Sequence, residues 1–297
     1  MSNDEILKGC ENDIRSRYVD KHIGFKKCRD GLIAILEILG ENNENREDIV
    51  DKNFAMMQCS RAKVLEILDM HDKNKAFDSA CGIYGGSLEY KVGKIVEPNR
   101  YSNSNLSEVC TSGIMYFLTE EAAYFYEYIP HDGMYKKWHE NGQIQKRCTY
   151  KDGELDGLCE EWHTNGQMDL RHTYKNGELD GHVEEWLKNG QMLMHFTYND
   201  NKIDGPCEEW HENGQMKLQC TYKDGEPDGQ YEEWHENGQM KLRHTYKNGK
   251  LEDLYESWSE NGQILIRCTF KNGEICGLKE VWNEDGSVNE KETKEYE

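Results

Sequence analysis

The sequence predicts a small α+β domain over residues 1–130, followed by an all-β antiparallel meander of about seven 24-residue β-hairpins. The main observation is that the seven tryptophans recur every 24 residues: Trp138, Trp162, Trp186, Trp210, Trp234, Trp258 and Trp282. Seven Asn-Gly or Asp-Gly pairs follow them in step, from Asn141-Gly142 to Asp285-Gly286. Apolar and polar residues alternate after these pairs. A tandem period of this length is typical of stacked units, each too small to fold alone.

Each repeat contains two predicted strands joined by a tight turn. In the second strand, residues 167–174, apolar side chains alternate with polar ones from Met168 onward, as in a half-buried strand. Asn165-Gly166 marks the turn. A two-residue loop would set Trp162 opposite Asp169, whereas a three-residue loop with a left-handed glycine sets it opposite Met168. Because burying a tryptophan outweighs a small difference between turn types, we predict the three-residue loop and one shared apolar face.

This shared face is the predicted structural core of the array. It contains the seven tryptophans and one aromatic residue from each second strand: Tyr150, Tyr174, Tyr198, Tyr222, Tyr246 and Phe270. A further apolar column lies three residues before the tryptophans, on the opposite parity: Tyr135, Cys159, Val183, Cys207, Tyr231 and Tyr255. Either a bulge at the Glu-Glu pair or partial burial of both sheet faces would explain this column, and the sequence leaves both possibilities open.

Titratable residues also recur in columns. One of them is a predicted acidic interaction strip for a basic partner, or otherwise a solvated stripe: Glu161, Glu185, Glu209 and Glu233. Histidines and cysteines recur in register, which raises the question of zinc. However, equivalent positions in neighbouring hairpins are two strands, or about 9–10 Å, apart, whereas zinc ligands lie about 2 Å from one ion. We therefore expect packing roles for these columns, reduced thiols, and no catalytic residue, metal or cofactor.

Local patterns predict the elements of the N-terminal domain. Residues 26–40 and 47–70 are predicted helices, because their apolar residues recur at three- and four-residue spacing. Strands are expected on either side of Gly93 and over residues 113–119. Thr119, followed by two glutamates, is the expected N-cap of a short helix.

The repeat unit, Gly-x-x-Glu-Glu-Trp-His-Glu-Asn-Gly-Gln-Met followed by Thr-Tyr-Lys-Asn-Gly, resembles the MORN repeat in its bacterial variant form, as carried by YwqK-like antitoxin proteins. The resemblance covers residues 132–288. Departures are local, at Asn201, Asp253 and Cys276 in the connecting turns. The resemblance implies a non-enzymatic scaffold for protein–protein interaction, and the historical name of these repeats suggests a lipid-associated scaffold as the alternative.

Residues 25–128 resemble a domain of unknown function found in proteins of large DNA viruses of amoebae. Three segments carry the resemblance: residues 58–62 (QCSRA), 90–98 (YKVGKIVEP) and 108–114 (EVCTSGI). It implies a viral origin rather than an activity.

A second resemblance in the same domain implies an enzymatic alternative. Residues 113–117 (GIMYF) are similar to the Gly-Ile-Tyr-Phe strand of ADP-ribosyltransferases. Those enzymes also need a His-Gly-Thr/Ser strand, for which this chain offers only Gly85-Gly86-Ser87, without the histidine. An activity of this kind would depend on Tyr116.

The charge distribution restricts the partners. The net charge is −21, and residues 131–297 carry 20 Lys and Arg against 35 Asp and Glu. Such a surface repels phosphate backbones and anionic lipid, so we expect no nucleic acid, no small-molecule substrate and no bare membrane, but a protein partner, basic by preference, or self-association. No signal-like or membrane-length apolar run is present, and we expect an intracellular protein of the host cytoplasm or the virion. The array is expected over residues 131–290, with a frayed acidic tail over 291–297.

Overall fold

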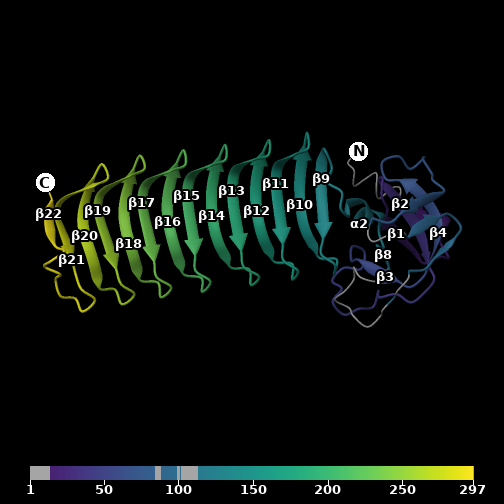
Figure 1. The fold of residues 1–297 in the computed structure, drawn as a ribbon, viewed down its shortest axis with the longest axis horizontal. Helices are drawn as coiled ribbons and strands as arrows, with labels where there is room; N and C mark the ends of the chain where they lie inside the picture. The colour runs from purple at the N-terminus through teal and green to yellow at the C-terminus, as the bar shows by residue number, and fades with distance from the viewer. Residues whose placement is uncertain (1–13, 84–87, 99–100, 102–112, 297) are drawn as a thin grey trace. The chain divides into compact units, whose positions relative to one another are not determined.

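The computed structural model describes residues 14–83, 88–98, 101 and 113–296, and it divides into two compact units (Figure 1). The first unit runs to Gly153 and includes Thr164–Gly166, and the second contains Glu154–His163 and the chain from Gln167 onward. The first hairpin of the array therefore belongs to the same unit as the N-terminal domain.

The first unit is built on short antiparallel strands. Its main sheet has the order β1-β2-β4-β7, with β1 at Ile23–Lys27, β2 at Leu32–Ile38, β4 at Ala62–Asp69 and β7 at Ile95–Val96. Two strand pairs accompany this sheet: β3 (Met57–Cys59) with β8 (Ile114–Tyr116), and β5 (Ser79–Cys81) with β6 (Glu89–Lys91). The helix α2 (Glu120–Phe125) follows β8.

The predicted helices over residues 26–40 and 47–70 are wrong, because both segments contain strands. β1 and β2 form a hairpin, and its turn residues Asp30 and Gly31 have φ values of 57° and 70°. Two consecutive positive φ values are the signature of a two-residue hairpin loop. All residues of β2 except Glu37 are buried. The helix-like spacing of apolar residues was therefore produced by strands covered on both faces.

The predictions for the end of the domain agree better with the structure. β8 lies within the predicted strand, and the Thr119 hydroxyl accepts a hydrogen bond from the Ala122 backbone N–H at 3.3 Å, so Thr119 is the N-cap of α2. Strands lie on either side of Gly93, but β6 pairs with β5 and β7 with β4, so they do not form one pair. Gly85-Gly86-Ser87 lies outside the described residues.

The core of the first unit consists of two buried clusters. Phe25, Ile33 and Ile35 belong to a cluster that includes residues of α2. Ala34 and Leu36 belong to a second cluster, with side chains of β3 and β8. These assignments alternate along β2, so the main sheet is covered by apolar side chains on both of its faces.

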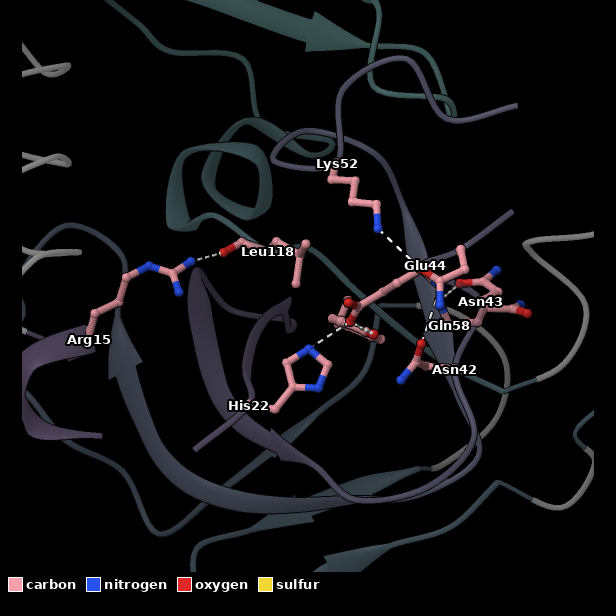
Figure 2. Close-up of polar contacts among 10 residues, drawn as sticks. Arg15, His22, Asn42, Asn43, Glu44, Lys52, Gln58 and Leu118 are labelled. Carbon is pink, nitrogen blue, oxygen red and sulfur yellow. Dashed lines mark hydrogen bonds and ion pairs between the residues drawn. The ribbon is translucent and has the colours of Figure 1, made fainter. Parts of the chain in front are cut away.

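Polar contacts hold the loop residues 42–44, here called the polar loop, against the rest of the domain (Figure 2). Nε2 of His22 lies 2.8 Å from a carboxylate oxygen of Glu44, and the fully buried Tyr116 donates its hydroxyl proton to the same carboxylate at 2.5 Å. The backbone N–H of Gln58 donates to the side-chain oxygen of Asn43 at 2.7 Å. These paired polar groups hold residues 42–44 against the buried Tyr116 and Gln58.

The first hairpin, β9 (Gly133–Trp138) and β10 (Ile144–Lys151), packs on the N-terminal domain. The rings of Trp138 and Phe54 are stacked, with centroids 4.6 Å apart. In the turn, the carbonyl of Asn141 accepts a hydrogen bond from the Val50 backbone N–H at 2.8 Å. The first tryptophan of the series is therefore used for packing between the domain and the array.

The repeats form a 14-stranded antiparallel meander in which β9 to β22 follow in chain order (Figure 1), as predicted for the array. The strands of the second unit are β11 (Glu154–Trp162), β12 (Met168–Lys175), β13 (Glu178–Trp186), β14 (Met192–Asn199), β15 (Lys202–Trp210), β16 (Met216–Lys223), β17 (Glu226–Trp234), β18 (Met240–Lys247), β19 (Lys250–Trp258), β20 (Ile264–Lys271), β21 (Glu274–Val281) and β22 (Lys294–Tyr296).

The predicted three-residue hairpin loop is confirmed. Gly166 has a φ of 85°, the His163 N–H donates to the Gln167 carbonyl at 2.9 Å, and Trp162 lies opposite Met168. The connecting turn between repeats is tighter, because Asn176 and Gly177 have φ values of 50° and 80° and form a two-residue loop.

The tail does not fray over its whole length as predicted. Residues 294–296 form β22, in which Lys294 lies opposite Lys279 and Tyr296 opposite Gly277. This short strand provides partners for the backbone of β21, which would otherwise be an exposed sheet edge.

Candidate functional site

The tryptophans do not lie on the predicted apolar face. In the hairpin of β11 and β12, Glu161 opposes Leu170 but Trp162 opposes Met168, so Asp169 is an additional residue in the second strand. The same irregularity recurs in the following hairpins. It is a bulge in the second strand and not one at the Glu-Glu pair, so Cys159 and Trp162 stay on opposite faces. The column of opposite parity therefore reflects partial burial of both sheet faces, the other explanation that the sequence left open. Because a bulge shifts the alternation of side chains, counting by twos through the turn assigned the tryptophan to the wrong face.

In the second unit, tryptophans lie beside charged side chains, on what we call the arginine face. The guanidinium of Arg171 lies 5.6 Å from the ring centre of Trp186 and forms ion pairs of 3.6 Å with Glu160 and 3.3 Å with Glu184. Equivalent contacts join Arg243 to Trp258 at 5.6 Å and Arg267 to Trp282 at 5.9 Å. The arginine face thus consists of tryptophans, arginines and the first glutamate of each Glu-Glu pair.

The opposite side of the sheet, which we call the tyrosine face, contains three rows of side chains running across the strands. Its central row is the most buried part of the second unit. It consists of residues that oppose one another from strand to strand: Cys159, His172, Val183, Phe196, Cys207, Cys220, Tyr231, His244, Tyr255 and Cys268. Two columns of the sequence pattern therefore form one row: the column of the first strands that begins at Cys159 and the column of the second strands that begins at His172. The sequence had placed these two columns on different faces of the sheet.

The second row of this face, the tyrosine row, contains Tyr174, Tyr198, Tyr222, Tyr246 and Phe270. Within their hairpins, these rings lie opposite a glycine or, for Phe270, opposite Asp253. All thirteen residues of the predicted repeat core, the tryptophans included, are half-buried rather than buried. In the second unit, the tryptophans lie on the arginine face and the aromatic residues of the second strands on the tyrosine face. The central row is more buried than either set, and the prediction missed it.

The third row, the glutamate row, contains the predicted acidic strip. In order across the sheet it consists of Glu161, Leu170, Glu185, Met194, Glu209, Leu218, Glu233 and Leu242. Each glutamate of the strip is thus flanked by an aliphatic side chain. Glu209 and Glu233 form ion pairs of 2.7 Å with Lys217 and 2.9 Å with Lys241.

Electrostatic shifts on the tyrosine face follow from burial and hydrogen bonding. Burial acts to raise the pKa of Glu233, but hydrogen bonds from Lys241 and Tyr231 outweigh it and hold that pKa below its ordinary value. Burial lowers the pKa of His244, which is 4% exposed and stacks on Tyr231 with ring centroids 4.6 Å apart. Glu233 therefore stays ionised and His244 neutral near pH 7.

The histidines that follow the tryptophans have a structural use that the sequence did not indicate. Their Nε2 atoms donate to the carbonyl of the next tryptophan: His163 to Trp186 at 3.1 Å, His211 to Trp234 at 2.9 Å and His235 to Trp258 at 3.0 Å. On the other edge of the sheet, the Asn176 N–H donates to the Asp156 carboxylate at 3.2 Å. Each turn is therefore tied to the turn 24 residues away.

The cysteines do not gather into a metal site in the part of the chain that is described, where no three His, Cys, Asp or Glu converge. Seven described cysteines are free, whereas Cys148 and Cys159 are disulfide-bonded. The expectation of reduced thiols is therefore wrong for these two. Cys148 lies in β10 and Cys159 in the following strand, β11. The distance argument made from the sequence compared only equivalent positions in neighbouring hairpins, which are two strands apart.

The residue on which the enzymatic alternative depends lies in the core. Tyr116 is 0% exposed, and burial together with the hydrogen bond to Glu44 raises its pKa. Its side chain is used for packing and for holding the polar loop. Among the residues that the structure describes, no helix is both long and apolar enough to cross a membrane.

Comparison with known proteins identifies both regions. Residues 12–123 match the model of a family of unknown function, DUF5758. Five segments, residues 132–152, 155–176, 203–224, 227–248 and 254–272, match the MORN repeat variant. No curated protein matches the chain. MORN repeats suggest a role in protein or membrane interaction scaffolds. The chain thus carries an N-terminal DUF5758 region followed by repeats of the MORN variant type.

Proposed function

We propose that this chain is a non-enzymatic interaction scaffold and that its tyrosine face binds a protein partner through a basic, partly apolar segment. The observation that carries the proposal is the alternation of glutamate and aliphatic side chains in the glutamate row, beside two rows of aromatic and apolar side chains. Aromatic residues with a polar surround are typical of protein interfaces.

The tyrosine face has room for a partner. Among the described residues, each strand from β12 to β20 packs mainly against its two neighbours in the sheet. The rings of the tyrosine row are half-buried by their own sheet and keep part of their surface accessible. A contiguous surface of half-buried aromatic and aliphatic side chains is a frequent site of association.

Charge determines the chemistry of the partner. Glutamates of the strip lie on alternate strands, about 9–10 Å apart. The lysines paired with Glu209 and Glu233 are about half exposed, with 52% and 53% of their side chains accessible, so they are at the rim of the row. An arginine of a partner can bind a carboxylate through two parallel hydrogen bonds, which a lysine cannot. A segment that carries arginine at about every third residue, with apolar residues between, would therefore match this face, because three residues of extended chain span about 10 Å.

Binding to the full chain of a synthetic peptide with arginine at every third residue and leucine between tests the proposal. Replacing Glu161, Glu185, Glu209 and Glu233 by Gln should weaken binding about tenfold or more, which corresponds to about 1.4 kcal/mol. The matched control replaces four exposed glutamates at the connecting turns, Glu154, Glu178, Glu226 and Glu274, by Gln. This control removes the same charge from another edge and should leave binding within about twofold.

Equal losses in both variants would mean that only net charge attracts the peptide, and absence of binding would overturn the proposal. Flotation with vesicles of phosphatidylserine and phosphatidylcholine tests the alternative of a lipid-associated scaffold. We expect no binding of the chain to these vesicles. Light scattering during size exclusion detects self-association.

We further infer that the protein is viral and acts in the host cytoplasm or in the virion. The likeness of its N-terminal region to a domain of large DNA viruses of amoebae supports this inference. Mass spectrometry of purified particles and of infected cytoplasm tests it, and absence from both would contradict it. An assay of NAD consumption, with Tyr116→Phe as the comparison, tests the ADP-ribosyltransferase alternative, for which we expect no turnover.

A further inference from the structure

Two cysteines face each other in the middle of the repeat sheet. Cys207 in β15 lies directly opposite Cys220 in β16. Their exposed fractions are 2% and 3%, and both thiols are free. These two cysteines are therefore a dithiol within one hairpin of the central row.

The backbone places this pair within the range of a disulfide. Opposed residues of antiparallel strands have Cα atoms about 4.5–5.5 Å apart, and disulfides join residues whose Cα atoms are about 4.4–6.8 Å apart. Cross-linking therefore requires rotation of the two side chains and no change in strand register. No other function described above uses either thiol.

Other free cysteines of the array do not have this arrangement. Cys268 lies opposite Tyr255, and Cys276 lies opposite Thr269. Cys159, which occupies the position of Cys207 two repeats earlier, is disulfide-bonded. The central row thus already includes an oxidised cysteine.

We propose that Cys207 and Cys220 are an oxidative modification site, which closes to a reversible disulfide when it reacts with a low-molecular-weight disulfide such as glutathione disulfide. The thiolate of Cys220 attacks one sulfur of the small disulfide and releases one small thiolate, leaving a mixed disulfide on Cys220. The thiolate of Cys207 then attacks the sulfur of Cys220 and releases the second small thiolate. Both protein sulfurs are oxidised, the small disulfide is reduced to two thiols, and the two protein protons pass to the released thiolates.

The surroundings favour Cys220 as the first nucleophile. Interaction with the Cys207 thiol lowers the pKa of Cys220, although burial and the nearby Glu209 and Glu233 oppose this shift. The same interaction between the two thiols, together with burial, raises the pKa of Cys207. A thiol that donates to its neighbour stabilises the neighbouring thiolate, as in other activated cysteine pairs. Each strand here packs mainly on its two neighbours in the sheet. Motion of the covering side chains therefore exposes the two thiols, and no second layer of the protein has to separate from the sheet.

Peptide mapping of the native full chain tests the proposal. The reduced protein is equilibrated with mixtures of reduced and oxidised glutathione, blocked with an alkylating agent and digested with trypsin. Cleavage after Lys202, Lys217 and Lys223 places the two cysteines on separate peptides, residues 203–217 and 218–223. We expect these peptides to be joined by a disulfide that dithiothreitol removes. Thermal unfolding of the oxidised protein should shift upward by a few degrees.

Three variants provide controls. Cys207→Ser and Cys220→Ser should each abolish the joined peptide and the thermal shift, and Cys268→Ser should abolish neither. Circular dichroism of each variant establishes that it folds. If a variant does not fold, the map of the unsubstituted protein still decides the outcome. Failure of the two peptides to join under oxidising conditions that leave the protein folded would overturn the proposal, as would their joining only after the protein is unfolded by urea.

Discussion

The guanidinium of Arg171 lies over the ring of Trp186, 5.6 Å from its centre, while its nitrogens reach Glu160 in one neighbouring strand and Glu184 in the other. This contact crosses from one hairpin to the next. The arginine face therefore joins successive repeats through a cation and an aromatic ring as well as through backbone hydrogen bonds.

A double-mutant cycle between Arg171→Ala and Trp186→Leu should give a coupling free energy of about 0.5–1 kcal/mol, the usual strength of a partly exposed cation–π pair. Free energies of unfolding from urea titrations of the four proteins measure it. Gln219 and Trp234 provide the matched control, since they occupy the equivalent positions without a cation. Their cycle should give a coupling near zero, and equal couplings in both cycles would refute a specific role for the guanidinium.

The turn of the first hairpin should tolerate substitution less than the next turn. Gly142 and Gly166 have nearly the same φ, 86° and 85°, so alanine suffers similar backbone strain at both positions. A Cβ on Gly142 would lie 2.0 Å from the Asp51 carbonyl oxygen, whereas on Gly166 the nearest atom is the flexible Gln143 side chain at 3.2 Å. Gly142→Ala should therefore cost about 1–3 kcal/mol more than Gly166→Ala in the free energy of unfolding. Equal costs would mean that the turn does not dock on the backbone near Asp51.

One repeat carries a correctable defect in its first strand, β19. Asp253 occupies a position with a φ of 64°, where other repeats have glycine. Because a residue with a Cβ is strained in this region, Asp253→Gly should raise the free energy of unfolding by about 1 kcal/mol. The reciprocal change, Gly229→Asp, should lower it, and thermal denaturation of both variants checks the two signs. A loss of stability in Asp253→Gly would show that the aspartate makes a compensating interaction.

The central row should make stability depend on pH through His244. Neither ring nitrogen of His244 has a hydrogen-bond partner among the described residues, and burial lowers its pKa, against the opposing effect of Glu233. Below pH 6.5 the unfolded chain binds a proton at this residue that the folded chain does not, so this contribution to stability is lost as the pH falls. His244→Phe, which copies Phe196 of the same row, should raise stability by about 1 kcal/mol and reduce the loss between pH 7 and 5.5.

His172→Phe is the matched control for this prediction, because Nδ1 of His172 lies 3.3 Å from the Tyr174 hydroxyl and the substitution removes that hydrogen bond. Urea titrations at several pH values compare the two variants. A pH dependence unchanged by His244→Phe would assign the acid sensitivity to other groups.

The array was predictable because its signals are local. The Asn-Gly pairs and the alternation in each second strand determine the hairpin, its loop length and the partner of Trp162 without reference to the rest of the fold. The face occupied by the tryptophans was not predictable in this way. It depends on Asp169 and its equivalents, which are polar like their neighbours and carry no sign that they are additional residues.

The prediction of helices in the N-terminal domain failed for a different reason. Leu32 to Ile38 is buried on both faces, so its apolar residues recur at helical and strand spacings alike. The informative feature is the Asp30-Gly31 turn, which falls inside the predicted helix and separates β1 from β2. In the candidate site, the strip of glutamates was found, but the aliphatic residues between them belong to adjacent strands and become neighbours only when the register is known.

The ties between turns have a consequence for how such an array changes length. The Asn176 N–H bonds to Asp156 and His163 bonds to the Trp186 carbonyl, so these contacts refer only to the adjoining unit. Insertion of one more copy of a unit that carries both residues would recreate these bonds at its borders. Genes for this architecture can therefore gain or lose such units while the neighbouring junctions keep their chemistry, so that the length of the sheet is adjustable in fixed steps.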